Sequence, residues 1–157
     1  MTFRVEEWTG EHPRWQEYVS LITAEGQARP AFGEFFQPHN PRYLVALQGD
    51  TIVGFLMFIH WVIGPHDAEI PAVKLGDSEL TEVKIIAFGV PKVHRRQGIG
   101  RMLQQEAIKR ARELGCYQVR SVSWHTKPEN HQLKLSMGFA AIPMERDEPA
   151  LTFVMKL

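Results

Sequence analysis

The sequence has little of what marks secreted or membrane-spanning proteins. Its 157 residues include one cysteine, Cys116, which cannot form an intramolecular disulfide. The most apolar run, Ile52 to Ile63, is interrupted by Gly54 and His60 and is far shorter than the roughly 20 residues of a membrane helix. The first residues do not combine a basic segment with an apolar run and a cleavage site. These absences predict a cytoplasmic protein that does not enter a membrane.

The sequence also lacks net charge and low-complexity segments. Eighteen Lys and Arg residues balance eighteen Asp and Glu residues, so no overall field draws the chain to nucleic acid. The length is that of one domain, residues 1–157. The basic residues are nevertheless uneven, because seven of the eighteen lie between Lys92 and Arg112. This concentration predicts a small polyanion as the ligand of that stretch.

Apolar periodicity predicts a chain of mixed strands and helices. Strands are expected at 2–8, 43–47, 51–62, 80–90, 117–124, 139–144 and 150–157, helices at 13–28, 98–114 and 128–137, and a long loop at 64–77. Residues 43–62 form a hairpin pattern around Gln48-Gly49-Asp50, whereas residues 80–124 form a strand-helix-strand pattern. The combination predicts an α+β fold with a mixed sheet.

The most informative segment, Val90 to Arg101, has the pattern of a strand end, a short loop and a helix start. The first turn of a helix has amides without intrahelical partners and the positive end of the helix dipole, so it receives a phosphate well. Gly98 and Gly100 allow close backbone approach, and the arginines nearby add charge-assisted contacts. The segment therefore predicts a phosphate-binding site.

Two familiar phosphate motifs do not fit this segment. The Gly-Lys-Ser/Thr of a P-loop is absent, and Leu103 stands where a dinucleotide-binding motif needs a small residue. Instead, Arg95-x-x-Gly98-x-Gly100, preceded by Val90, resembles the acyl-CoA signature of the GNAT (GCN5-related) N-acetyltransferase superfamily. The helix that follows, the next strand and helix, and the Gly138-Phe139 pair come in the order of that family.

The resemblance implies a sheet of about six to seven strands flanked by helices and splayed between two central parallel strands. It implies acetyl-CoA as the co-substrate and direct transfer of the acetyl group to an amine of a small molecule or peptide. The expected acetyl-CoA contacts are the backbone of Phe88, Gly89 and Val90, the segment Arg95, Arg96, Gln97, Gly98, Ile99, Gly100 and Arg101, and Asn130 beyond the second strand.

The catalytic groups are less evident from the sequence. In many members of the superfamily a tyrosine four residues before the Gly-Phe pair acts as the acid, but here that position is Lys134. Lys134 can serve as the acid if burial lowers its pKa, and is otherwise a surface lysine. Glu82, on the strand before the motif, is a candidate base acting through water, or else a solvated glutamate. His125, just after the second parallel strand, is the other candidate base, or else a histidine without a role.

The acceptor pocket is expected, from the resemblance, to include the segment after the first helix. Phe32, Glu34, Phe35 and Phe36 suit an amine on an apolar body, or else form a lid over the core. Histidine spacing predicts no metal site. A homodimer is expected because dimers are common in the superfamily. Two other functions compete with the enzyme: a non-catalytic acyl-CoA-binding or regulatory module, and a protein that holds ATP or NAD in the same loop.

Overall fold

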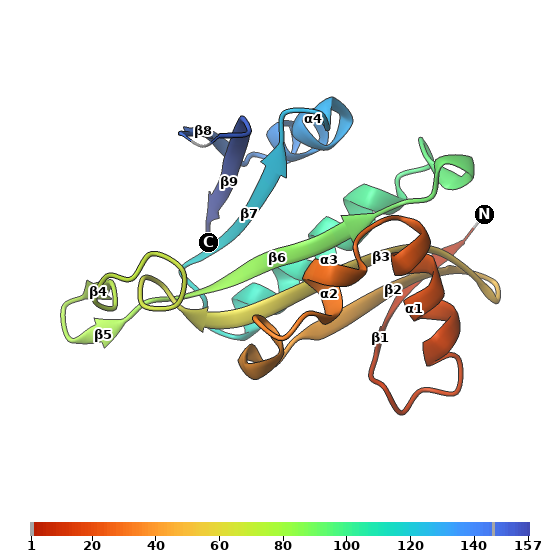
Figure 1. Ribbon diagram of the computed structural model, residues 1–157, viewed down its shortest axis with the longest axis horizontal. Helices are drawn as coiled ribbons and strands as arrows, with labels where there is room; N and C mark the ends of the chain where they lie inside the picture. The colour runs from red at the N-terminus through yellow and green to blue at the C-terminus, as the bar shows by residue number, and fades with distance from the viewer. Residues whose placement is uncertain (1, 146) are drawn as a thin grey trace. The chain divides into compact units, whose positions relative to one another are not determined.

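The computed structural model describes residues 2–145 and 147–157. Within them the strands are β1 (Phe3–Trp8), β2 (Arg42–Gln48), β3 (Thr51–Val62), β4 (Lys74–Leu75), β5 (Ser78–Glu79), β6 (Thr81–Gly89), β7 (Gln118–Trp124), β8 (Ala140–Met144) and β9 (Ala150–Lys156). The helices are α1 (Trp15–Ala24), α2 (Ala28–Phe32), α3 (Ile99–Glu113) and α4 (Pro128–Ser136), with 3₁₀ turns at Gln37–His39 and Lys92–His94. Figure 1 labels these elements.

Seven of the described strands form one hydrogen-bonded sheet in the order β1-β2-β3-β6-β7-β9-β8. β6 and β7 are parallel, whereas β1 with β2, β2 with β3, β7 with β9 and β8 with β9 are antiparallel. The expected α+β fold with a mixed sheet of six to seven strands is therefore confirmed. The chain divides into two compact units, Met1–Ile59 with Ile86–Ala107 and His60–Ile85 with Ile108–Leu157, which are described separately.

The first unit is built on the antiparallel strands β1, β2 and β3, which lie side by side in Figure 1. β3 is buried without a break from Ile52 to Ile59, as the long apolar run predicts. α1 packs on β2 through Tyr18, whose hydroxyl donates to the Leu44 carbonyl at 3.0 Å. Tyr18 and Ile22, one helical turn apart, have no exposed surface. Apolar burial at helical spacing therefore holds α1 on the sheet.

The second unit contains the parallel pair and the C-terminal strands. Paired residues of β6 and β7 run from Glu82 with Gln118 to Ile85 with Ser121, while the strands continue to Gly89 and Trp124. The wedge-shaped opening beyond the paired part stays a prediction. β9 pairs with β7 along its whole length and with β8 on its other side.

The structure corrects three predicted elements. α1 ends at Ala24 rather than about Ala28, because Gly26 takes a left-handed φ of 74° and ends the helix. The expected loop at 64–77 contains β4, which pairs with β5 across a turn with Gly76 at φ 63°. The helix expected at 98–114 is α3, which ends at Glu113, and Leu114 after it is 36% exposed.

Candidate active site

The loop between β6 and α3 turns through two left-handed backbone positions. Arg96 has a φ of 65° and Gly98 a φ of 83°, and α3 begins immediately afterwards at Ile99. The Met102 amide donates to the Gly98 carbonyl at 3.0 Å, so the amides ahead of Met102 belong to the open first turn. A left-handed arginine is uncommon, and such positions concentrate at binding sites. The turn thus presents amides at the positive end of a 15-residue helix.

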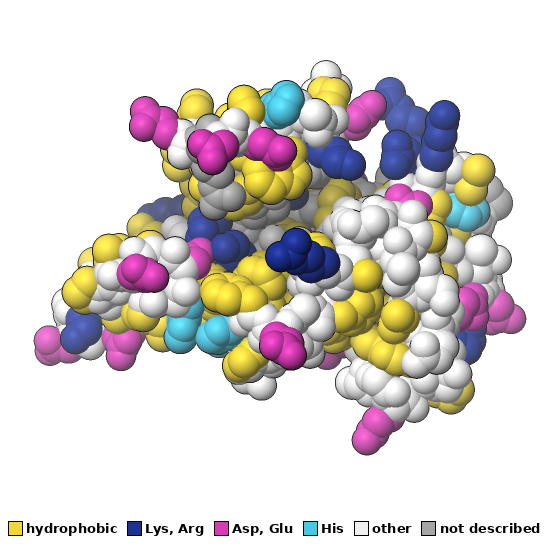
Figure 2. All heavy atoms as spheres, in the orientation of Figure 1, with side chains coloured by type: hydrophobic (Ala, Val, Ile, Leu, Met, Phe, Trp, Pro, Cys, Tyr) yellow, Lys and Arg dark blue, Asp and Glu magenta, His cyan; other side chains and the backbone are white. Residues whose placement is uncertain are grey.

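Side chains around this turn add positive charge. Arg95 braces the loop by donating from Nε to the Val90 carbonyl at 2.8 Å. Residues 95–98 are exposed, as is Arg101 in the first turn of α3. Ile99 is only 1% exposed, so it anchors the helix in the core and offers backbone alone. Figure 2 shows Lys and Arg side chains gathered over the segment that joins β6 to α3, and these groups fit a pyrophosphate.

The backbone of Phe88, expected to pair with the donor arm, is held by a residue that the sequence did not single out. Gln27, between α1 and α2, accepts from the Phe88 N–H through Oε1 at 2.9 Å and donates from Nε2 to the Phe88 carbonyl at 2.8 Å. Both residues belong to the first unit. A lone glutamine after a helix carries no sequence signal for this contact, which depends on how the chain returns to β6.

Lys134 is buried, so the interpretation as a surface lysine is wrong. Its exposed fraction is 1%, and burial lowers its pKa to about 7. The Lys134 Nζ lies 5.8 Å from the centroid of the Phe139 ring, and the Lys134 carbonyl accepts from the Phe139 amide at 3.1 Å. The condition set by the sequence for an acid at this position, a pKa lowered by burial, is therefore met.

The start of α4 places Asn130 and His131 on the end of β7. Asn130 donates from Nδ2 to Ser123 Oγ at 3.0 Å, and His131 Nε2 lies 3.1 Å from the same oxygen. Asn130 Oδ1 is buried, and no described residue donates to it. His125 stands exposed after β7, with Nδ1 3.0 Å from the Pro149 carbonyl. A neutral His125 that donates from Nδ1 keeps Nε2 as an acceptor for a proton.

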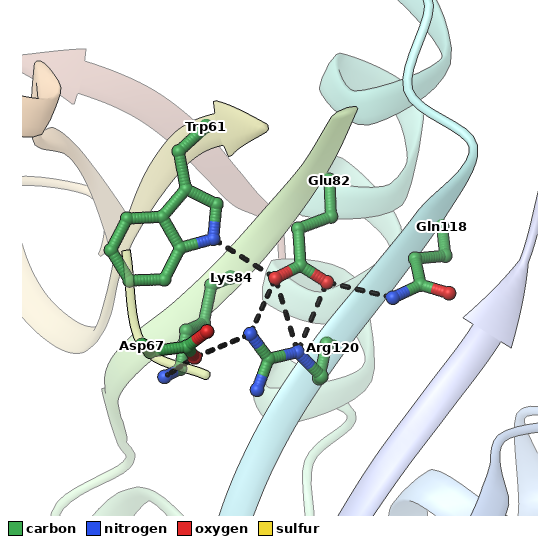
Figure 3. A network of polar contacts seen from close by, with 6 residues as sticks. All are labelled: Trp61, Asp67, Glu82, Lys84, Gln118 and Arg120. Atoms are coloured by element: carbon green, nitrogen blue, oxygen red, sulfur yellow. Dashed lines mark hydrogen bonds and ion pairs between the residues drawn. The ribbon is translucent and has the colours of Figure 1, made fainter. Parts of the chain in front are cut away.

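Glu82 has no exposed surface, so the interpretation as a solvated glutamate is wrong. Figure 3 shows its carboxylate surrounded by donors. Arg120 Nε lies 3.1 and 3.0 Å from the two carboxylate oxygens, Trp61 Nε1 donates to Oε1 at 2.9 Å, and Gln118 Nε2 donates to Oε2 at 2.7 Å. Burial raises the pKa of Glu82, but the Arg120 guanidinium and the other donors outweigh it and lower the pKa overall. These contacts favour a carboxylate that stays ionised over one that accepts a proton.

The same network ties the loop after β3 to the parallel strands (Figure 3). Asp67 Oδ2 accepts from Arg120 Nη2 at 2.6 Å and from Lys84 Nζ at 2.8 Å. His66 stacks on Trp61 with ring centroids 5.2 Å apart. Two consecutive loop residues are thus docked by aromatic and ionic contacts.

Replacement of Glu82 by glutamine is expected to lower the free energy of unfolding by about 2 kcal/mol at pH 7, because Arg120 keeps its burial and loses one of its two charged partners, with only Asp67 left. The lowered pKa of Glu82 means that its ion pair stabilises the fold above the unfolded value of 4.5 and loses this effect as pH falls through the folded pKa. Urea unfolding at pH 7 and pH 4 measures both effects. The exposed Glu79→Gln is the control; equal stability of the two variants at pH 7 contradicts the assigned role.

The four predicted acceptor residues divide into packed and exposed side chains. Phe32 stacks on Tyr43 with centroids 5.6 Å apart and meets Trp15 edge-on at 6.0 Å. Phe35 is 60% exposed and contacts Phe36 edge-on at 4.8 Å. Glu34 is exposed. Phe32 therefore packs α2 against β2, whereas Glu34 and Phe35 face solvent and Phe36 is half-buried.

The two units share the predicted site residues between them. Phe88, Gly89, Val90 and the segment from Arg95 to Arg101 belong to the first unit together with Gln27. Glu82, His125, Asn130 and Lys134 belong to the second unit. The roles of all these residues stay predictions.

No helix in residues 2–145 and 147–157 is long and apolar enough to cross a membrane. In the same part of the chain, no group of three or more His, Cys, Asp and Glu residues is arranged to hold a metal ion.

The architecture is shared with N-acyltransferases of known structure. Arabidopsis thaliana NAA60 in complex with acetyl-CoA is 17% identical with a TM-score of 0.77, covering 99% of each chain. A chain of the NatC complex bound to Gag peptide and CoA is 15% identical with a TM-score of 0.72, covering 100% of this chain and 99% of that one. A Bacillus subtilis acetyltransferase in complex with CoA is 13% identical with a TM-score of 0.66 and 99% coverage of both. The fold is therefore that of the N-acyltransferases.

The sequence itself identifies the family. The model of the acetyltransferase (GNAT) family matches residues 6–139, which include the loop before α3, β7 and α4. This chain belongs to the acetyltransferase (GNAT) family, and the match supports acetyl transfer from acetyl-CoA to an amine as its function. The comparison with curated proteins finds no match.

Proposed function

We propose that this chain is an active N-acetyltransferase that transfers the acetyl group directly from acetyl-CoA to an amine, with Lys134 as the acid. The observation that carries the proposal is the burial of Lys134, whose pKa is lowered to about 7. A lysine side chain of that pKa is half protonated near neutral pH. A general acid is most effective when its pKa lies close to the pH at which the enzyme works. It stands at the position that a tyrosine occupies in many members of the family.

The donor is held, in this proposal, by the turn before α3. The amides of the first helical turn and the charges of Arg95, Arg96 and Arg101 take the pyrophosphate, and Asn130, in the second unit, is a further candidate contact of the donor. The thioester supplies the acetyl group. Lys134 gives its proton to the departing thiolate, and acetyl transfer to the amine releases a proton that the chain or solvent takes up.

Of the two candidate bases, His125 has the more suitable surroundings. Its Nδ1 is engaged by the Pro149 carbonyl, which leaves Nε2 to accept a proton. Glu82 accepts from three side chains and its pKa is lowered. We therefore assign Glu82 to holding Arg120 and His125 to proton uptake.

The acceptor is proposed to be an amine of a peptide or of a small molecule. Arabidopsis thaliana NAA60 has also been solved with a bisubstrate analogue, and the NatC structure contains a Gag peptide, which supports the peptide alternative by fold similarity. Phe35, Phe36 and Glu34 are the side chains that we propose to line the acceptor end. A cytoplasmic location and a homodimer stay predictions.

The decisive experiment is incubation of the protein with acetyl-CoA and a panel of peptide and small-molecule amines, with free thiol followed over time. Thiol release that depends on the amine is expected. If CoA stabilises the protein in a thermal shift measurement and no amine of the panel is acetylated, the result would instead support a non-catalytic acyl-CoA-binding module. The lysine at position 134, in place of a tyrosine, is the reason to consider this alternative. Stabilisation by ATP or NAD and not by CoA would support a nucleotide-binding protein.

A further inference from the structure

The side-chain amide of Gln27 makes hydrogen bonds to both backbone polar groups of Phe88. The Phe88 N–H donates to Gln27 Oε1 at 2.9 Å, and Gln27 Nε2 donates to the Phe88 carbonyl at 2.8 Å. One side chain therefore does for Phe88 what one residue of a neighbouring antiparallel strand does in a hydrogen-bonded pair. The contact lies beyond the part of β6 that pairs with β7, which ends at Ile85.

The surroundings make this contact close and specific. A Cβ built on Gly89 would lie 2.6 Å from the Phe55 ring, so the glycine leaves room for that ring, and Gln27 Nε2 lies 3.4 Å from the same Cβ position. The carbonyl two residues further on, that of Val90, accepts from Arg95. The N–H of Phe88 is a single donor, so a second acceptor can bind it only after Gln27 has moved.

Acetyl-CoA has amides of the same chemistry in its pantetheine arm. This step depends on the proposed function, in which the arm pairs with the end of β6. A secondary amide of the arm that bonds to Phe88 requires one of the two positions, acceptor or donor, that Gln27 fills. We propose that Gln27 is a displaceable partner of Phe88: its carboxamide holds the end of β6 in strand geometry, and a pantetheine amide takes its place when acetyl-CoA binds.

The position of Gln27 links the exchange to the acceptor end. Gln27 directly precedes α2, and its carbonyl accepts from the Ala31 amide at 3.1 Å. Release of the Gln27 side chain from β6 thus frees the segment that carries the proposed acceptor residues. Acetyl-CoA is therefore expected to alter the affinity for the amine.

The test is binding of two probes to wild type and Gln27→Leu by calorimetry. Acetyl-CoA is expected to bind the variant about threefold to tenfold more tightly, because it no longer displaces two hydrogen bonds. Adenosine 3′,5′-bisphosphate, which has the nucleotide charge and no amide arm, is expected to bind both proteins equally. Gln37→Leu is the matched control, because Gln37 Nε2 bonds to Ala31 and Tyr43 in the same segment and not to β6.

A second readout uses wild type alone, so it does not depend on the folding of a variant. The side-chain NH₂ signals of Gln27 are expected to move and to lose protection from hydrogen exchange on saturation with acetyl-CoA. Weaker or unchanged binding of acetyl-CoA by Gln27→Leu, or unmoved Gln27 signals at saturation, overturns the displacement. Failure of wild type to bind acetyl-CoA overturns the donor assignment itself.

Discussion

Lys134→Met is expected to lower kcat about a hundredfold while making the protein more stable. A positioned acid typically contributes a factor of about 10² or more, and methionine has the length of the lysine stem without a proton to give. The loss is expected in kcat more than in KM for acetyl-CoA, because the donor is held elsewhere. In wild type, kcat at saturating substrates is expected to fall above a pH of about 7, as Lys134 loses its proton.

The gain in stability follows from the cost of burying a charge. The folded pKa of Lys134 is about 7, below the ordinary 10.5, so the folded chain binds fewer protons than the unfolded chain between these values. Wild-type stability therefore rises with pH across this range, and the full cost is present below pH 7. Methionine removes it, and the variant is expected to be on the order of 3 kcal/mol more stable at pH 6, with a smaller difference at pH 9.

Urea unfolding at the two pH values and steady-state kinetics check both parts. Lys109→Met is the matched control, because Lys109 is an exposed lysine of α3. It is expected to change neither kcat nor the dependence of stability on pH. A Lys134→Met protein that retains its kcat excludes Lys134 as the acid, and one that is less stable at pH 6 contradicts the cost assigned to its charge.

Gly98→Val is expected to weaken acetyl-CoA binding about a hundredfold or more and to abolish stabilisation by CoA. Gly98 has a φ of 83°, a conformation that a β-branched residue adopts only under strain. Nothing lies within 4 Å of a Cβ built there, so the side chain meets no steric clash and the cost is conformational. The turn is expected to rearrange, and the first-turn amides of α3 then no longer converge on a phosphate.

The same helix provides a control for this change. Gly115, after the other end of α3, has a φ of 73° and equally open space around its Cβ position. Gly115→Val carries the same kind of strain, on the order of 1 to 2 kcal/mol, at a site that contributes nothing to the donor. Both variants are expected to lose similar stability in thermal unfolding, and only Gly98→Val to lose the CoA shift. Equal CoA binding by the two variants contradicts the assignment of the turn.

Local sequence patterns determined most of the fold. The alternation and runs of apolar residues predicted the helices and strands in the right order. A helix or strand that is buried on one face has apolar residues at a fixed spacing, and a strand that is buried on both faces has a continuous apolar run. Errors fell where a single residue decides a boundary, as at Gly26, or where a short hairpin has two residues in each strand and no room for a period.

The candidate site, like the fold, was predicted from the sequence only where its residues are close together along the chain. The turn before α3 was predicted from the sequence, because its amides, its glycines and its arginines are all close along the chain. Its left-handed Arg96 became apparent only in the backbone conformation.

The state of the ionisable groups was decided by the tertiary structure alone. Lys134 and Glu82 were each open to a solvated interpretation, and both are buried, one with its pKa lowered by desolvation and the other by Arg120 and its neighbours. A pKa depends on what surrounds a group in space, and Arg120 is 38 residues from Glu82 along the chain. The bond from Gln27 to Phe88 spans 61 residues. The sequence by itself indicated acetyl-CoA as the donor, and only the folded chain decided which of the candidate side chains are buried and in which direction their pKa values shift.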